Sequence, residues 1–170
     1  MKQNFCPSVI DFEASGFGSE SYPIEVGIVT STGERYCSLI RPHDDWQYWD
    51  GDAQSLHELS RDLLLRKGRP IRDVCCEINA FANNTILYSD AWVHDKPWLT
   101  KLFFYGGLEP EFTLSPIESI VSEEQLEMWD EVKKQVFGAS SFVRHRASND
   151  ALVIQQTFIE TRRLYQKRSA

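Results

Sequence analysis

The strongest constraint on the fold comes from the first forty residues, where three β-rich runs are joined by short connections. The runs cover residues 8–13, 23–30 and 35–40. Gly16 and Gly18 end the first run, and the turn dipeptide Thr32-Gly33 separates the second from the third. Strands with connections this short pair in antiparallel fashion. We therefore predict a three-stranded antiparallel meander.

Beyond residue 50, helical patterns alternate with short β-rich runs. Apolar residues recur at helical spacing between Ile71 and Ala82, and residues 122–125 match a capping box. The expected helices are residues 53–65 (in short pieces), 71–82, 97–105, 122–137 and 147–167, and the expected strands are 85–88 and 112–121. This order predicts an α/β fold with a mixed five-stranded sheet, meander plus parallel strands, flanked by helices.

Length and composition fit a single domain over residues 1–170. With 42% hydrophobic and 25% charged residues, 170 residues can build one core and hardly two. No apolar run reaches the ~18–20 residues that a membrane helix needs, and none resembles a signal peptide. We therefore expect a cytoplasmic protein with no membrane partner. The four cysteines lack zinc-site spacing and are expected to be reduced, mostly buried thiols.

The net charge of −7 argues against a protein that coats long nucleic acids, because such proteins usually present a basic surface. An acidic chain that handles nucleic acid is expected to grip only an end. Divalent cations would then supply the local positive charge.

The sequence Asp11-Phe12-Glu13 is the strongest local motif. Side chains two apart on a strand point the same way, so both carboxylates face one side at the end of the first strand. Two such anions repel each other, and the arrangement persists most readily with a cation between them. Hard oxygen ligands of this kind suit magnesium or manganese.

A histidine precedes an aspartate by five residues near the other end of the chain. On one continuous helix, His145 and Asp150 would lie about 140° apart. We therefore expect His145 on the loop that enters the last helix and Asp150 in its first turns. Because imidazole titrates near neutrality, His145 suits the role of general base.

A third polar group follows the strand expected at residues 85–88. It offers Asp90, His94 and Asp95 as candidate ligands where a strand gives way to a helix. The ends of strands are where ligand sites gather in α/β sheets.

Together these segments resemble the DEDDh exonucleases, which include ribonuclease T, oligoribonuclease and the proofreading subunit of bacterial DNA polymerase III. VIDFEASGF resembles the family's first motif, PIEVGIV follows at its usual distance, and residues 40–62 resemble the stretch before the second motif. Asp95 with Trp98-Leu99 resembles the second motif, and HRASNDA the third. The second motif departs from the pattern, because His94 replaces the usual aromatic residue and Asp90 is a rival ligand.

The resemblance implies an RNase H-like fold and a 3′→5′ exonuclease that uses two divalent ions, Mg²⁺ or Mn²⁺. Asp11 would bridge both ions, Glu13 and Asp150 would bind the ion that carries the attacking water, and Asp95 would hold the other. His145 would take the proton of that water. Ions ~3.5–4 Å apart can stabilise both the attacking and the leaving oxygen, and the product would be a nucleoside 5′-monophosphate.

The candidate contacts to the terminal nucleotide surround these motifs. The backbones of Phe12 and Ala14 and the hydroxyl of Ser15 flank the metal ligands, and Trp92 is a candidate stacking platform. His57 resembles a family histidine near the terminal nucleotide, with an exposed helix position as the alternative. Arg144 and Arg146 flank the proposed base and are candidate phosphate contacts.

The expected partners are 3′ ends of single-stranded or frayed DNA or RNA. Some of the family act as dimers, so a homodimer is left open. Two other functions remain alternatives: a catalytically silent nucleic-acid-binding domain of the same fold, which would fail to bind metal, and a metal-dependent phosphatase, which would act on mononucleotides.

Overall fold

A five-stranded mixed sheet forms the centre of the protein in the computed structural model, which describes residues 5–141 and 143–168. The strand order is β3-β2-β1-β4-β5, antiparallel between β1, β2 and β3 and parallel between β1, β4 and β5. The strands are β1 Ser8–Ala14, β2 Pro23–Val29, β3 Arg35–Leu39, β4 Ile86–Ser89 and β5 Thr113–Pro116. The predicted meander and mixed sheet are confirmed.

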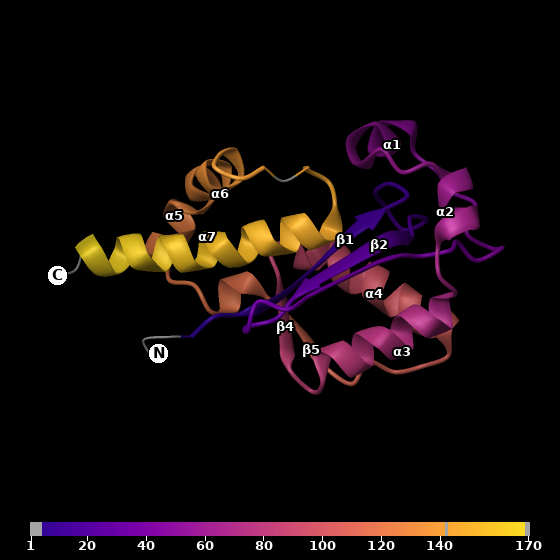
Figure 1. Ribbon diagram of the computed structural model, residues 1–170, viewed down its shortest axis with the longest axis horizontal. Helices are drawn as coiled ribbons and strands as arrows, with labels where there is room; N and C mark the ends of the chain where they lie inside the picture. The colour runs from indigo at the N-terminus through magenta and orange to yellow at the C-terminus, as the bar shows by residue number, and fades with distance from the viewer. Residues whose placement is uncertain (1–4, 142, 169–170) are drawn as a thin grey trace.

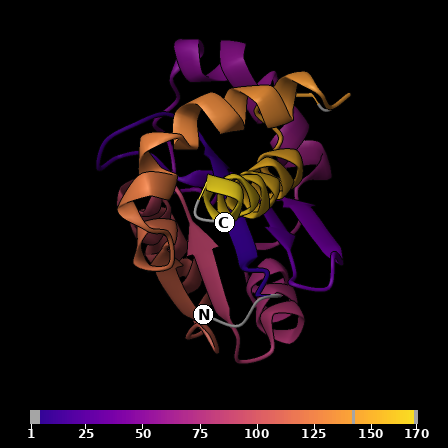
Figure 2. The same cartoon turned by 90° about the vertical axis from the view of Figure 1, so that its left-hand side faces the viewer.

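Helices cover both faces of this sheet (Figures 1 and 2). The long helix α7 packs on β1 and β2, whereas α3 packs on α4, which contacts β1, β2 and β5. The helices are α1 Gly51–His57, α2 Arg61–Lys67, α3 Ile71–Ala82, α4 Trp92–Gly106, α5 Glu123–Glu127, α6 Trp129–Gly138 and α7 Ala147–Arg168, with a 3₁₀ turn at Ile117–Ser119. None of the helices described is long and apolar enough to cross a membrane.

Alternation along β1 divides its side chains between two cores. Ile10 and Phe12 belong to the larger core with α3 and α4, whereas Val9 belongs to the smaller core with α7. Because side chains of a strand alternate between faces, Asp11 and Glu13 share the α7 face with Val9. The motif therefore points its apolar member into the main core and its two carboxylates toward the first turn of α7.

Gly27 allows α7 to approach the sheet closely. It is the partner of Asp11 in the β1–β2 register, and a Cβ at this position would overlap the backbone of Ala147 and Ser148. A side chain here would therefore push the start of α7 away from the sheet. The glycine sets the distance between the carboxylates of β1 and those of α7.

Several boundaries differ from those predicted. Helix α4 begins at Trp92 rather than Pro97, so Asp95 lies in its first turns and not ahead of it. Proline can occupy a helix at the cost of one backbone hydrogen bond, and the carbonyl it leaves unpaired belongs to Val93, which is 70% exposed and open to water. The last strand ends early, at Pro116, which has no N–H to continue the ladder.

The capping box at Ser122 and Gln125 is present as predicted, but the helix it starts is interrupted at Met128, where α5 ends and α6 begins. All four cysteines are free thiols. The expectation that they are mostly buried is wrong for Cys37 and Cys76, which are exposed.

Candidate active site

Four carboxylates and one histidine converge where β1 ends beside β4. Asp11 and Glu13 come from β1, Asp95 from the start of α4, and Asp150 from the first turn of α7. The ligand atoms of Glu13, His145 and Asp150 all lie within 4.8 Å of one another. Residues far apart in the sequence thus form one acidic cluster with an imidazole at its edge.

Asp95 is the most buried member of the cluster, with 1% of its surface exposed. Ser89, at the end of β4, donates a hydrogen bond from Oγ to Asp95 Oδ2. The other carboxylate oxygen, Oδ1, is buried and has no hydrogen-bond partner among the described residues. Because an unpartnered buried carboxylate oxygen is costly, this atom is arranged to meet a ligand that protein groups do not supply.

Asp90, the rival of Asp95, is engaged elsewhere. Its carboxylate forms an ion pair with Lys133 of α6. Asp90 does not cap α4, because the N-cap residue is Ala91, whose backbone N–H donates to the Ser89 hydroxyl. Asp90 is thus paired with a cation of the protein, whereas Asp95 has a buried oxygen without a partner among the described residues.

Burial and mutual repulsion raise the pKa values of these carboxyl groups. Burial, followed by the charge of Asp150, raises the pKa of Glu13 to about 8. Burial also raises the pKa of Asp11, and the charge of Asp95 is the second cause. For Asp95 and Asp150, burial is again the main cause of a raised pKa. A divalent cation would offset this repulsion, so the donor set of hard oxygens and one imidazole fits such an ion.

His145 is held at this site by its neighbours in sequence. It has a left-handed backbone, with φ of 56°, on the loop just before α7, as the spacing predicted. Arg146 donates from Nη2 to Glu25 Oε1 at 2.6 Å, and the backbone N–H of Ala147 donates to Glu25 Oε2 at 3.0 Å. Glu25, fully buried on β2, therefore fixes the loop that carries the histidine.

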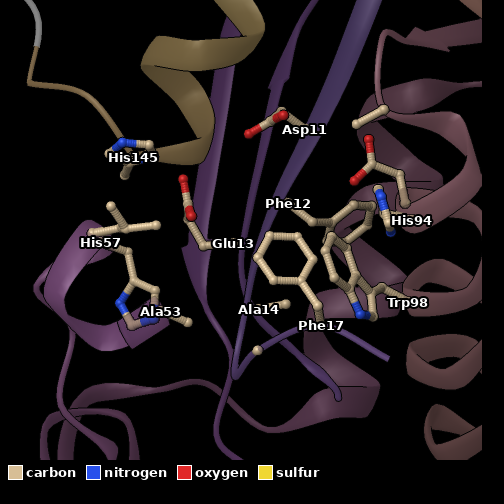
Figure 3. A pocket seen from close by; sticks show the side chains of 14 residues that line it. Asp11, Phe12, Glu13, Ala14, Phe17, Ala53, His57, His94, Trp98 and His145 are labelled. Atoms are coloured by element: carbon tan, nitrogen blue, oxygen red, sulfur yellow. The ribbon is translucent and has the colours of Figure 1, made fainter. Parts of the chain in front are cut away.

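A cavity of about 200 Å³ opens beside the carboxylates (Figure 3). His145, His57 and Ala53 lie on one side of it, and Phe17, His94 and Trp98 lie on the other. The His94 ring stacks on Trp98 with centroids 5.9 Å apart, and Phe17 meets the His94 ring edge-on at 5.6 Å. The cavity thus has an aromatic wall of Phe17, His94 and Trp98 opposite His57 and His145.

His57 is buried rather than exposed, so the exposed alternative is wrong. Its Nδ1 accepts a hydrogen bond from the backbone N–H of Leu59 at 3.0 Å, which places the proton of the neutral ring on Nε2. Burial lowers the pKa of His57, although the Ala14 backbone oxygen opposes this. Nε2 is itself buried and has no hydrogen-bond partner within the described residues, and the His57 ring lines the cavity.

The other predicted contacts are distributed differently. Phe12 and Ala14 line the cavity, but the buried Ser15 hydroxyl accepts from the backbone N–H of Tyr22. Trp92 packs against the main core and donates to the Leu114 carbonyl. Arg146 pairs with Glu25, and Arg144 lines a neighbouring groove.

Sequence reasoning did not assign Phe17 or Leu56 to the cavity, and it offered His94 as a candidate ligand, whereas the structure places the His94 ring in the cavity wall. Phe17 and Leu56 are 61% and 54% exposed, and both line the cavity. Exposed apolar side chains that gather at one hollow are typical of a binding surface. The signal available in the sequence was the position of Phe17, directly after the first motif. Leu56 offered none, because nothing in a short helix indicates which residue meets a distant strand.

Comparisons with known proteins give a clear result for the fold alone. Neither a protein family nor a curated protein matches the sequence. Among solved structures, exonuclease I of E. coli in complex with a dT13 oligonucleotide is similar, with a TM-score of 0.70, 13% identity, and coverage of 94% of this chain and 42% of that chain. A zinc-bound form of the E. coli ExoI–ssDNA complex gives a TM-score of 0.70, 12% identity, and coverage of 93% and 41%.

A product-bound structure of exonuclease I gives a TM-score of 0.68 at 11% identity, with coverage of 96% of this chain and 46% of that chain. The present chain thus spans less than half the length of these structures. At such low identity the likeness shows the fold: an RNase H-like α/β sheet flanked by helices, as expected.

Proposed function

We propose that this protein is a metal-dependent 3′→5′ exonuclease that releases nucleoside 5′-monophosphates from the ends of DNA or RNA. The observation that carries the proposal is the acidic cluster, in which Glu13, His145 and Asp150 place ligand atoms within 4.8 Å of one another and Asp95 presents an unpartnered oxygen. The similarity to exonuclease I complexes with oligonucleotides supports the same function.

Asp11, Glu13, Asp95 and Asp150 would hold divalent cations, Mg²⁺ or Mn²⁺. Such cations supply charge stabilisation to the attacking and leaving oxygens of a phosphodiester. His145 stands beside Glu13 and Asp150 at the open side of the cluster, where it can accept a proton from an attacking water molecule. The protein thus supplies a base at the same point where the carboxylates gather.

In the proposed reaction, the water oxygen bonds to the phosphorus of the last linkage as the bond to the 3′ oxygen of the preceding nucleotide breaks. That oxygen leaves and takes up a proton, while the phosphate stays on the 5′ oxygen of the released nucleotide. The terminal nucleotide would occupy the cavity. Its base can stack on the aromatic wall formed by Phe17, His94 and Trp98, and the His57 ring lines the other side of the cavity.

A catalytically silent nucleic-acid-binding domain fits the site less well. A domain of that kind has no use for carboxyl groups whose pKa values are raised by burial and by neighbouring carboxylates, as for Glu13, or for a buried oxygen without a partner. Such features cost stability and are expected at sites that bind a cation.

The test is cleavage of 5′-labelled single-stranded DNA and RNA oligonucleotides in magnesium, manganese or EDTA. We expect a ladder that shortens from the 3′ end, that disappears in EDTA and with Asp11→Ala, and that persists with the control Asp73→Ala on the exposed face of α3. A folded protein that cleaves neither substrate in either metal would reject the proposal and favour the silent binding domain.

A further inference from the structure

A second hollow borders the acidic cluster at Asp150. This groove, of about 420 Å³, lies between α6, the loop before α7 and the first turns of α7. Its lining residues are Asp130, Lys133, Lys134, Phe137, Arg144, Asp150 and Val153. Asp150 lines the groove and also belongs to the acidic cluster, so the groove borders the candidate metal ligands.

The face that α6 turns to this groove is cationic. Asp130, Lys133, Lys134 and Phe137 follow the spacing i, i+3, i+4, i+7, which places them along one side of the helix. Helix α6 packs beside α7 (Figure 1), and the residues that it buries are Trp129 and Val132, which lie off this stripe. Here two lysines occupy the middle of the stripe, and they do so in a chain with a net charge of −7.

Arg144 completes the basic lining from the opposite side. Its guanidinium lies over the Phe137 ring, 5.1 Å from the centroid, and this contact holds it at the groove. Both Lys134 and Arg144 are exposed, and within the described parts of the chain neither forms an ion pair. Lys133 pairs with Asp90, so the groove offers two cations that are available to an anionic ligand.

Resting on the proposed function, we infer that this groove binds the phosphates of the strand on the 5′ side of the scissile linkage, so that the substrate is an oligonucleotide strand rather than a dinucleotide. A 3′-terminal nucleotide has a neighbour only on its 5′ side. A strand whose last nucleotide fills the cavity must therefore leave it past the carboxylates. The groove begins at that point, and its lysines and arginine complement phosphate charge.

Asp130 is the acidic exception in the groove. It lies about one helical turn before Lys133 and Lys134, at the end of α6 farther from the loop that carries Arg144. Its carboxylate would repel a strand that extends beyond the lysines. The contact is therefore expected to span about two phosphates, and removal of the Asp130 charge should strengthen binding rather than weaken it.

The test is binding of an oligothymidylate of about 12 nucleotides, fluorescent at its 5′ end and closed at its 3′ end by phosphorothioate linkages that resist hydrolysis. Fluorescence anisotropy in calcium chloride gives the dissociation constant at several salt concentrations. We expect the double variant Lys134→Ala/Arg144→Ala to weaken binding about tenfold and to reduce the slope of log Kd against log salt by about 1.4. Asp130→Asn is expected to tighten binding.

The matched control is Arg66→Ala/Lys67→Ala, which removes the same charge from the last turn of α2, outside the groove. If this control weakens binding as much as the groove variant, or if the groove variant binds like the wild type, the inference is overturned. A dinucleotide, which cannot reach the groove, should lose less affinity than the oligomer in the groove variant. If the groove variant binds more weakly but the wild type cleaves no substrate, only the proposed function is rejected. If the wild type cleaves and the groove variant binds as tightly as the wild type, only the inference about the groove is rejected.

Discussion

Glu25 and Arg146 form a buried ion pair that connects the second strand to the loop of the proposed base. The Glu25 side chain is fully buried, and Arg146 reaches it with Nε at 3.1 Å and Nη2 at 2.6 Å. Glu25 also accepts from the backbone N–H of Ala147, the first residue of α7. One carboxylate therefore fixes both the start of α7 and the residue next to His145.

Glu25→Gln is expected to destabilise the protein by about 3 kcal/mol, at the lower end for a broken buried pair because the Arg146 side chain is 40% exposed. Activity should fall through kcat, since the loop that positions His145 loosens while the cavity stays intact. Urea unfolding and steady-state kinetics measure the two effects. The control is Glu111→Gln on an exposed loop, and equal stability of the two variants would show that the pair does not hold the loop.

Gly27→Ala is expected to separate α7 from the acidic cluster. The added methyl group would overlap the backbone at Ala147 and Ser148, so either strand or helix must shift, at a cost of about 1–3 kcal/mol. Because Asp150 moves with α7, affinity for Mn²⁺ should fall about 10–100-fold. Calorimetric titration with Mn²⁺ measures this, and Gly51→Ala, where a Cβ meets open space, is the control. Unchanged metal affinity would mean that Gly27 does not set the geometry.

The carboxylates of the site were predictable from sequence because they depend on local geometry. The Asp11 and Glu13 pair follows from strand alternation, and the placement of His145 before the helix that carries Asp150 follows from helix periodicity. The meander followed from short connections. In each case the information lies within a few residues, where backbone geometry determines which way side chains point.

The walls of the cavity and the anchoring of the loop that carries His145 could not be predicted in the same way. Leu56 reaches the site because α1 folds back over the end of β1, and Arg146 is drawn to Glu25, a residue 121 positions earlier. Both depend on contacts between distant segments, which spacing does not encode. The start of α4 was misplaced because Pro97 suggested a helix start, whereas its missing hydrogen bond is tolerated beside solvent-exposed Val93.

Substitutions of Asp95 and of Asp90 are expected to affect metal binding differently. Asp95 presents a buried oxygen without a partner, whereas Asp90 is neutralised by Lys133. Asp95→Asn is therefore expected to lower kcat about 10²–10³-fold and to abolish one metal-binding event in calorimetry, while Asp90→Asn lowers kcat less than about tenfold. Each variant is the control for the other, since both changes remove one carboxylate from the same short segment. A larger loss of metal binding from Asp90→Asn would reverse the assignment of the ligand.

The pH dependence of stability should reveal the crowded carboxylates when metal is absent. The pKa of Glu13 is raised by burial from 4.5 to about 8, so the folded protein holds a proton there that the unfolded chain releases. For a pKa raised on folding, the stabilisation is fully present below the unfolded value and is lost as pH rises through the folded value. In EDTA, the wild type should therefore lose stability between about pH 4.5 and pH 8 as Glu13 ionises.

Glu13→Gln isolates this contribution, because the amide has nearly the same shape and never ionises. We expect the variant and the wild type to have similar Tm values in EDTA at pH 5, and the variant to be more stable by about 4 °C at pH 9, where Glu13 is charged. Manganese should raise the Tm of the wild type more at pH 9 than at pH 5, because protons no longer compete for the carboxylate, and should raise that of the variant less. Differential scanning fluorimetry across this range is the measurement. If the wild type is as stable as the variant at pH 9 in EDTA, then burial and the neighbouring carboxylates do not raise the pKa of Glu13. The electrostatic argument for a cation at this site would then fail.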